Sequence, residues 1–164
     1  DANASREAIV KLSDLLDYML YEGNKKIIDL NEEIQFIRNY IELERLRHDE
    51  NFNVRFDFPE NSREIQIAPL ILFPFVENAF KHGFRNTENP FIHIELKTNK
   101  EKIIFRVTNN AAAASCDPYL NQEGKGIGLK NSRERLHLLY KDKHKLNIEQ
   151  QNQTYLVHLE ITHS

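Results

Sequence analysis

The sequence has little of several features that mark particular classes of protein. A single cysteine, Cys116, excludes an intramolecular disulfide and is typical of a chain kept in a reducing compartment. No apolar run approaches the length of a membrane span or a signal peptide, so we expect no membrane contact by this chain. Lys and Arg form no dense run and the formal net charge is −3, which argues against a nucleic-acid partner.

The common nucleotide-binding loops are also missing, although three of the five glycines alternate at Gly124, Gly126 and Gly128. A P-loop requires Gly-Lys followed by Ser or Thr, whereas Lys125 is followed by glycine. The dinucleotide fingerprint requires its third glycine one residue later than it occurs here. Alternating glycines before a helix do free backbone N–H groups to approach an anion. By itself, this segment favours a flexible loop over a phosphate site.

The chain has enough apolar residues to bury one sizeable core, since 40% of its 164 residues are hydrophobic and 29% are charged. A first amphipathic helix is predicted to end near Gly23, with apolar residues at helical spacing: Leu12, Leu15, Leu16, Met19 and Leu20. Asp29, followed three residues later by Glu32, indicates a capping box for a second helix that extends to about Arg47. The two helices would form a hairpin, which in the simplest case packs on its own domain.

From residue 52 onward the periodicity becomes that of an α/β protein. Alternating apolar residues predict five strands, at residues 53–58, 91–96, 102–107, 145–149 and 154–161. Helices are predicted from Pro69 to Gly83 and over residues 129–140. Residues 109–125 lack periodicity and are expected to form a loop.

The helix that ends at Gly83 carries polar side chains at a functional spacing. Asn78, Lys81 and His82 stand at i, i+3 and i+4, so an amide oxygen, an ammonium and an imidazole share one face. Such a face suits Mg²⁺ and phosphate. Together with the glycine segment, it predicts a nucleotide site built without a Walker loop. For His82 two roles stay open: contact with ribose or phosphate, or interaction with the helix dipole at the C-terminus.

These two segments also carry a resemblance to a known family. Val-Glu-Asn-Ala-Phe-Lys-His-Gly at 76–83 resembles the N box, and Gly-Lys-Gly-Ile-Gly-Leu-Lys-Asn at 124–131 the second glycine box, of one ATP-binding domain. That domain is shared by gyrase, heat-shock chaperones, histidine kinases and MutL. Within this superfamily the chain is most similar to the LytS-like sensor histidine kinases. The similarity extends through four further segments, at residues 12–21, 40–47, 68–72 and 133–136.

The resemblance implies a two-layer α/β sandwich, the Bergerat-type ATP-binding fold, preceded by a helical hairpin. Its mixed sheet would be covered on one face by helices, and ATP would lie between the helices and a lid formed by residues 109–125. Residues 1–50 would be the hairpin, a partial dimerisation and phosphoacceptor region. Residues 51–164 would be the ATP-binding catalytic domain.

The resemblance also implies ATP and Mg²⁺ as cofactors, and it assigns roles to residues. Asn78 would be the metal ligand, and both Asn78 and Lys81 would be catalytic, because Mg²⁺ and Lys81 would hold the phosphates in place. The remaining nucleotide contacts would come from His82, Asn109, Gly124, Gly126, Gly128 and Leu129.

Two positions depart from the superfamily pattern. Asn109 stands where most members have an Asp that accepts a hydrogen bond from the adenine amino group, and Ala111 replaces the expected glycine. A neutral amide oxygen is a weaker hydrogen-bond acceptor than a carboxylate. The alternative to an adenine contact is that Asn109 and the asparagine after it simply form a turn at the end of a strand. Pro74 occupies the position of the Glu that activates water in the hydrolysing members, which disfavours chaperone-like ATP hydrolysis. Glu77, adjacent to Asn78, would have at most a supporting role.

The implied activity is that of a protein histidine kinase in a two-component system. The γ-phosphoryl group would pass to a His upstream of this sequence, which starts at Asp1 without an initiator Met, and then to a response regulator. We interpret the chain as a fragment, a cytoplasmic part of a bacterial inner-membrane sensor that is a homodimer at full length. His48, followed by Asp49, is more typical of a helix C-terminus than of an acceptor site. The alternatives are a degenerate nucleotide-binding or dimerisation module and an anti-sigma-type serine kinase.

Overall fold

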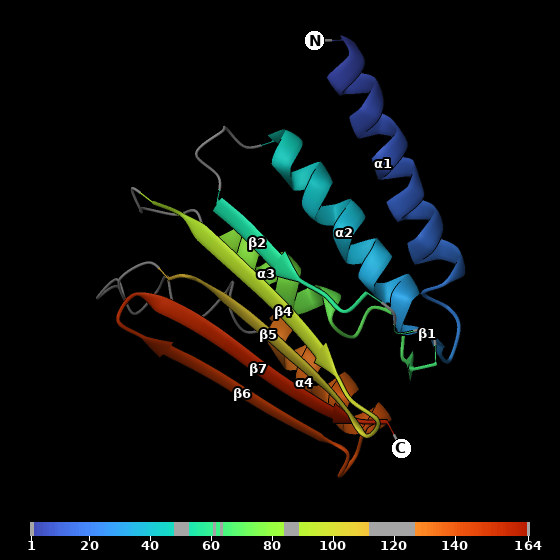
Figure 1. Cartoon of the computed structure of the whole chain (residues 1–164), viewed down its shortest axis with the longest axis vertical. Helices are drawn as coiled ribbons and strands as arrows, with labels where there is room; N and C mark the ends of the chain where they lie inside the picture. The colour runs from blue at the N-terminus through green and yellow to red at the C-terminus, as the bar shows by residue number, and fades with distance from the viewer. Residues whose placement is uncertain are drawn as a thin grey trace.

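The computed structural model describes residues 2–47, 53–60, 62, 64–83, 89–111 and 127–163. Its main sheet has the strand order β2-β4-β5-β7-β6, in which β2 runs parallel to β4 and every other pair is antiparallel. The strands are β2 (Asn53–Asp57), β4 (Phe91–Thr98), β5 (Lys102–Asn110), β6 (His144–Gln151) and β7 (Thr154–Thr162). Two helices, α3 (Phe73–His82) and α4 (Ile127–Leu139), lie on one face of the sheet (Figure 1). The predicted two-layer α/β sandwich with a mixed sheet is therefore confirmed.

The alternation of apolar residues explains which face of the sheet the helices cover. On β5, Ile103, Phe105 and Val107 are fully buried, while the intervening residues are more exposed. Because successive side chains point to opposite faces, this strand directs these three apolar residues toward α3 and the intervening residues, most of them polar, away from it. A parallel β2–β4 pair also needs a crossover connection, and α3 lies within that connection.

The predicted helical hairpin is formed by α1 (Ala2–Tyr21) and α2 (Leu30–Arg47). The Asp29 carboxylate accepts the Asn31 N–H at 2.9 Å, so it acts as the expected N-terminal cap of α2. Figure 1 shows α2 beside the β2 edge of the sheet, with α1 outside it. The expected domain boundary at residue 50 and the candidate acceptor His48 lie outside the described residues. Among the described helices, none has the length and apolarity needed to cross a bilayer.

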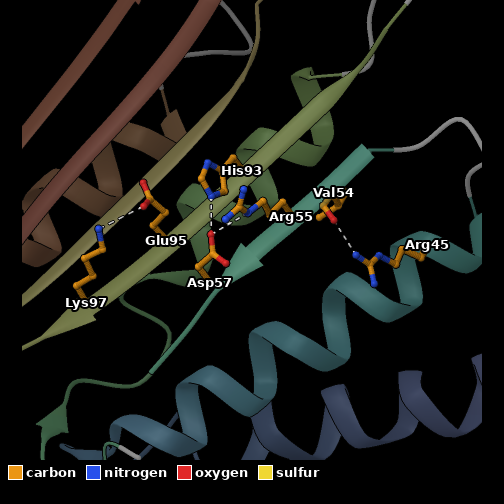
Figure 2. Close-up of polar contacts among 7 residues, drawn as sticks. All are labelled: Arg45, Val54, Arg55, Asp57, His93, Glu95 and Lys97. Carbon is orange, nitrogen blue, oxygen red and sulfur yellow. Dashed lines mark hydrogen bonds and ion pairs between the residues drawn. The ribbon is translucent and has the colours of Figure 1, made fainter. Parts of the chain in front are cut away.

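The inner helix of this hairpin is part of the main core. Ile34, Ile37 and Ile41 of α2 are buried in the same apolar cluster as the inner residues of α3 and the sheet. At the sheet edge, the Arg45 guanidinium donates to the Val54 carbonyl oxygen at 2.7 Å (Figure 2). This bond satisfies a main-chain group of an edge strand, which would otherwise face solvent or another chain.

Two local features differ from the sequence-based expectations. Strands β1 (Ile28–Asp29) and β3 (Gln66–Ile67) form a second, two-stranded antiparallel sheet that was not predicted, because two residues carry no periodicity. The helix expected to begin at Pro69 begins instead at Phe73. Leu70 has φ = 55°, in the left-handed region, so an α-helix cannot pass through it. Pro74 then lies in the first turn of α3, where a missing N–H removes no helical hydrogen bond.

Candidate functional site

Helix α3 has one buried apolar face and one polar face. Phe75, Val76, Ala79 and Phe80 are buried toward the core. Asn78 and His82 are half-buried on the other side, where Lys81 is exposed. The helical period thus turns the amide, ammonium and imidazole groups away from the core.

The polar face of α3 borders a small cavity whose opposite wall is the start of α4. The cavity has a volume of about 90 Å³ and is lined by Pro74, Glu77, Asn78, Lys81, His82, Gly128 and Leu129. Five residues predicted to bind nucleotide, from segments about 50 positions apart, therefore meet at one place. Sites that enclose a whole organic ligand usually measure about 300 to 1,000 Å³, so this space matches a phosphate group or a hydrated ion. Gly124 and Gly126 lie outside the described residues.

Asn109 lies behind the C-terminal end of α3, next to this cavity but not among its lining residues. A Cβ added at Gly83 would stand 3.3 Å from the Asn109 Cβ and 2.6 Å from the Ala79 carbonyl oxygen, so only glycine fits there. Asn109 is 1% exposed, and its Nδ2 donates to the Asn110 carbonyl at 2.6 Å. Its Oδ1 is buried and accepts no hydrogen bond from any described residue, which leaves an acceptor available for a ligand.

A second buried polar atom without a partner among the described residues belongs to Tyr155, which was not predicted from the sequence to be a site residue. On β7 it pairs directly with Asn109 on β5, and the neighbouring pair Val107 and Val157 shows that both side chains face the helical layer. The Tyr155 hydroxyl is buried and, within the part of the chain that the structure describes, has no hydrogen-bond partner. Burial raises its pKa, so the group is a neutral donor near neutral pH. Only the strand register reveals this pair, because the two residues are 46 positions apart in the sequence.

A cluster of metal-ligand side chains lies on the opposite, open face of the sheet. Figure 2 shows Asp57, His93 and Glu95 together, with one ligand atom of each within 4.8 Å of the others. The Asp57 carboxylate contacts both His93 Nε2 at 2.9 Å and Arg55 Nε at 3.0 Å. Lys97 Nζ lies 3.5 Å from the Glu95 carboxylate.

These contacts give the cluster the character of an ion-pair network. The hydrogen bond from His93, together with the Arg55 guanidinium, lowers the pKa of the Asp57 carboxyl. Each carboxylate already has a cationic partner, and a divalent ion would have to compete with Arg55 and Lys97 at a solvent-exposed position. The cluster links β2 to β4, and its charges do not favour a cation site.

Comparison with known proteins yields a family match, curated relatives and solved structures. The histidine kinase family model matches residues 1–52. Sensor protein kinase HptS of Staphylococcus aureus (strain USA300) is 28% identical in an alignment 163 positions long, which covers 93% of this chain and 31% of the relative. The chain therefore spans about a third of the length of the curated relatives that it matches.

Two solved structures have the same fold as this chain. The catalytic domain of histidine kinase ThkA superposes with a TM-score of 0.60 at 21% identity, covering 84% of this chain and 96% of that domain. Histidine kinase ThkA in complex with the response regulator protein TrrA gives a TM-score of 0.57 at 18% identity, covering 95% of this chain and 48% of that one. At these identities the likeness concerns the fold alone.

Proposed function

We propose that this chain, which is related to the sensor histidine kinases, is the ATP-binding catalytic part of such a kinase. It would transfer the γ-phosphoryl group of ATP to a histidine upstream of Asp1, from which a response regulator receives it. The relationship predicted from the sequence is confirmed by the family match, the HptS relative and the fold of the solved catalytic domains. The observation that carries the proposal is the single cavity shared by Asn78, Lys81, His82, Gly128 and Leu129.

The residues around the cavity fit magnesium and phosphate. Bound ATP would supply the phosphoryl group, and Mg²⁺ would neutralise part of its charge. Asn78 would hold the ion through its amide oxygen, since Mg²⁺ accepts few protein ligands beside water and phosphate. Lys81 is exposed at the same wall and would attract the phosphates. The glycines at 124 and 126 would add backbone N–H donors ahead of α4.

The unpaired polar atoms of Asn109 and Tyr155 support an adenine contact. The Asn109 oxygen is an acceptor, as the exocyclic amino group of adenine requires, and the Tyr155 hydroxyl is a donor suited to a ring nitrogen. Both atoms lie at the same sheet position, behind the end of α3. A bound base would satisfy groups that are otherwise costly to bury.

The outer face of α1 supports assembly as a homodimer. Leu15 is buried on the inner side of α1, but Ile9, Leu12, Leu16 and Met19 are between 45% and 68% exposed. Their spacing of three, four and three residues is that of the a and d positions in a helical bundle. We infer that a second copy of the chain covers this stripe, so α1 would contribute both to the hairpin and to a dimer.

Calorimetric titration of ATP with and without Mg²⁺ tests the proposed function. Asn78→Ala should abolish the Mg²⁺ dependence of binding and leave the fold nearly intact, because alanine is a good helix former at a half-buried position. Asn39→Ala is the matched control, since Asn39 is also a half-buried helical asparagine but lies on α2, away from the cavity. An unchanged Mg²⁺ dependence in folded Asn78→Ala would exclude Asn78 as the metal ligand.

A further inference from the structure

The turn that precedes α3, residues 68–72, has a strained backbone and is here called the Leu70 turn. Leu70 has φ = 55°, a left-handed conformation that is unfavourable for a residue with a Cβ. Such a conformation persists only where the surrounding structure holds it. The conformation of Leu70 therefore depends on the side chains that contact its backbone.

Two charged side chains of opposite sign hold the two backbone groups of Leu70. Glu33, which is on α2 and fully buried, accepts the Leu70 N–H through Oε2 at 2.7 Å. Arg135, on α4, donates from Nη1 to the Leu70 carbonyl oxygen at 2.9 Å and from Nη2 to the Pro69 carbonyl oxygen at 2.5 Å. Hydrogen bonds to charged groups are the stronger ones, so the turn is fixed from both sides.

Glu33 also supplies the cap that α3 lacks. Leu72 is the N-cap residue of α3, and its apolar side chain makes no capping bond. Glu33 Oε1 accepts the Leu72 N–H at 3.2 Å, so a carboxylate from another helix satisfies a main-chain donor at the start of α3. Glu33 Oε2 also accepts a hydrogen bond from the Tyr18 hydroxyl at 3.1 Å, which links the same carboxylate to α1.

The helices tied together at the Leu70 turn are those that form the cavity. Asn78, Lys81 and His82 follow Leu72 on α3, and Gly128 and Leu129 precede Arg135 on α4. We propose that Glu33 and Arg135 are positioning residues for the nucleotide site. By fixing the Leu70 turn, they set the start of α3 against α4 and anchor both cavity walls to the helical hairpin. This inference rests on the proposed function.

Nucleotide affinity of the full chain tests the proposal through Glu33→Gln. A glutamine has one acceptor oxygen and so cannot accept both the Leu70 and the Leu72 N–H groups. The dissociation constant for Mg²⁺-ATP, measured by titration at a temperature where circular dichroism shows full folding, should rise by about tenfold. The matched control is Glu32→Gln, the same change at the exposed neighbouring position, and it should leave the affinity unchanged.

Three further variants distinguish a positioning role from an effect on stability alone. Arg135→Lys keeps the charge but cannot span two carbonyl oxygens, so it should also weaken binding, whereas Arg133→Lys at an exposed position should not. Ile161→Val removes a methylene from the buried core and should lower the unfolding free energy without changing the affinity of the folded chain.

The possible outcomes distinguish this inference from the proposed function. Unchanged affinity in folded Glu33→Gln, or in Arg135→Lys if the first variant does not fold, would overturn the positioning role alone. An unaltered chain that binds no ATP would refute both proposals.

Discussion

Asn109 and Tyr155 show how much of a site can depend on single atoms. An unsatisfied buried polar group costs about 1–3 kcal/mol, and here two directly paired residues of adjacent strands each carry an atom that no described residue satisfies. A fold selected for stability alone would carry apolar side chains at both positions. The pair is therefore better explained by a ligand that satisfies it than by the packing of the sheet.

The substitution Tyr155→Phe distinguishes the effect of the Tyr155 hydroxyl on stability from its effect on nucleotide binding. Without nucleotide, the variant should be as stable as the unaltered chain or more stable by up to about 1 kcal/mol, because it loses only an unpaired hydroxyl. With nucleotide, it should bind ATP roughly five- to tenfold more weakly, since it cannot donate to the base. Urea unfolding and ATP titration measure the two effects.

Tyr140→Phe provides a matched contrast to Tyr155→Phe. The Tyr140 hydroxyl accepts the Ala68 N–H at 2.7 Å, so its removal should lower stability. If Tyr155→Phe also lowers stability and binds ATP normally, the Tyr155 hydroxyl has a structural partner and no role toward the base.

Asn109→Asp tests the base contact from the acceptor side. A charged acceptor should strengthen ATP binding relative to GTP by about 1 kcal/mol. The same change places a carboxylate oxygen where Nδ2 now donates to the Asn110 carbonyl, so the nucleotide-free chain should become less stable. Competition titrations with both nucleotides measure the preference, and a folded variant that has lost ATP binding would show that Asn109 does not face adenine.

Among the helices and strands, sequence periodicity predicted the long elements and failed on the short ones. The five strands of the main sheet were predicted because each alternates between more buried and more exposed residues along much of its length. The two-residue strands β1 and β3 carry no such signal. The start of α3 was misplaced because Pro69 has the chemistry of a first helical residue, while the left-handed Leu70 is held by Glu33 and Arg135 from other helices.

The α1 stripe leads to a prediction about assembly. Leu16 is 52% exposed in the middle of the stripe, and a lysine there would place a charge in the seam of a helical bundle. Sedimentation equilibrium should therefore show a dimer for the unaltered chain and a weaker dimer, by at least about tenfold in dissociation constant, for Leu16→Lys.

Leu138→Lys is the control for this assembly prediction. Leu138 is the more exposed of the two leucines, at 80%, but it lies on α4, so the substitution should leave the dimer unchanged. A chain that stays monomeric at every concentration, or equal effects of the two lysines, would contradict the proposed role of α1.

For the whole molecule, the architecture could be predicted more completely than the site. The order of strands and helices follows from local patterns, and the N box and glycine box identify two segments that meet in one cavity. Tyr155, Glu33 and Arg135 escaped prediction because their roles arise from strand register and from contacts between helices. No local pattern in the sequence encodes such contacts.

The last prediction concerns phosphoryl transfer by the whole molecule. In the proposed site, Lys81 and an Mg²⁺ ion on Asn78 would hold the phosphates, but Pro74 stands where a water-activating Glu would be needed, one turn before Asn78. The 164-residue chain should therefore bind Mg²⁺-ATP, hydrolyse it very slowly and leave its own histidines unlabelled. A longer chain, extended ahead of Asp1 by an acceptor-histidine segment, should acquire acid-labile phosphohistidine, because acceptor and nucleotide site are then held in one assembly. Radiolabelled ATP and mass spectrometry of both chains provide the comparison. Labelling of the short chain at His48 would make that residue the acceptor, and a dimeric long chain that binds ATP without labelling would instead be a nucleotide-binding module.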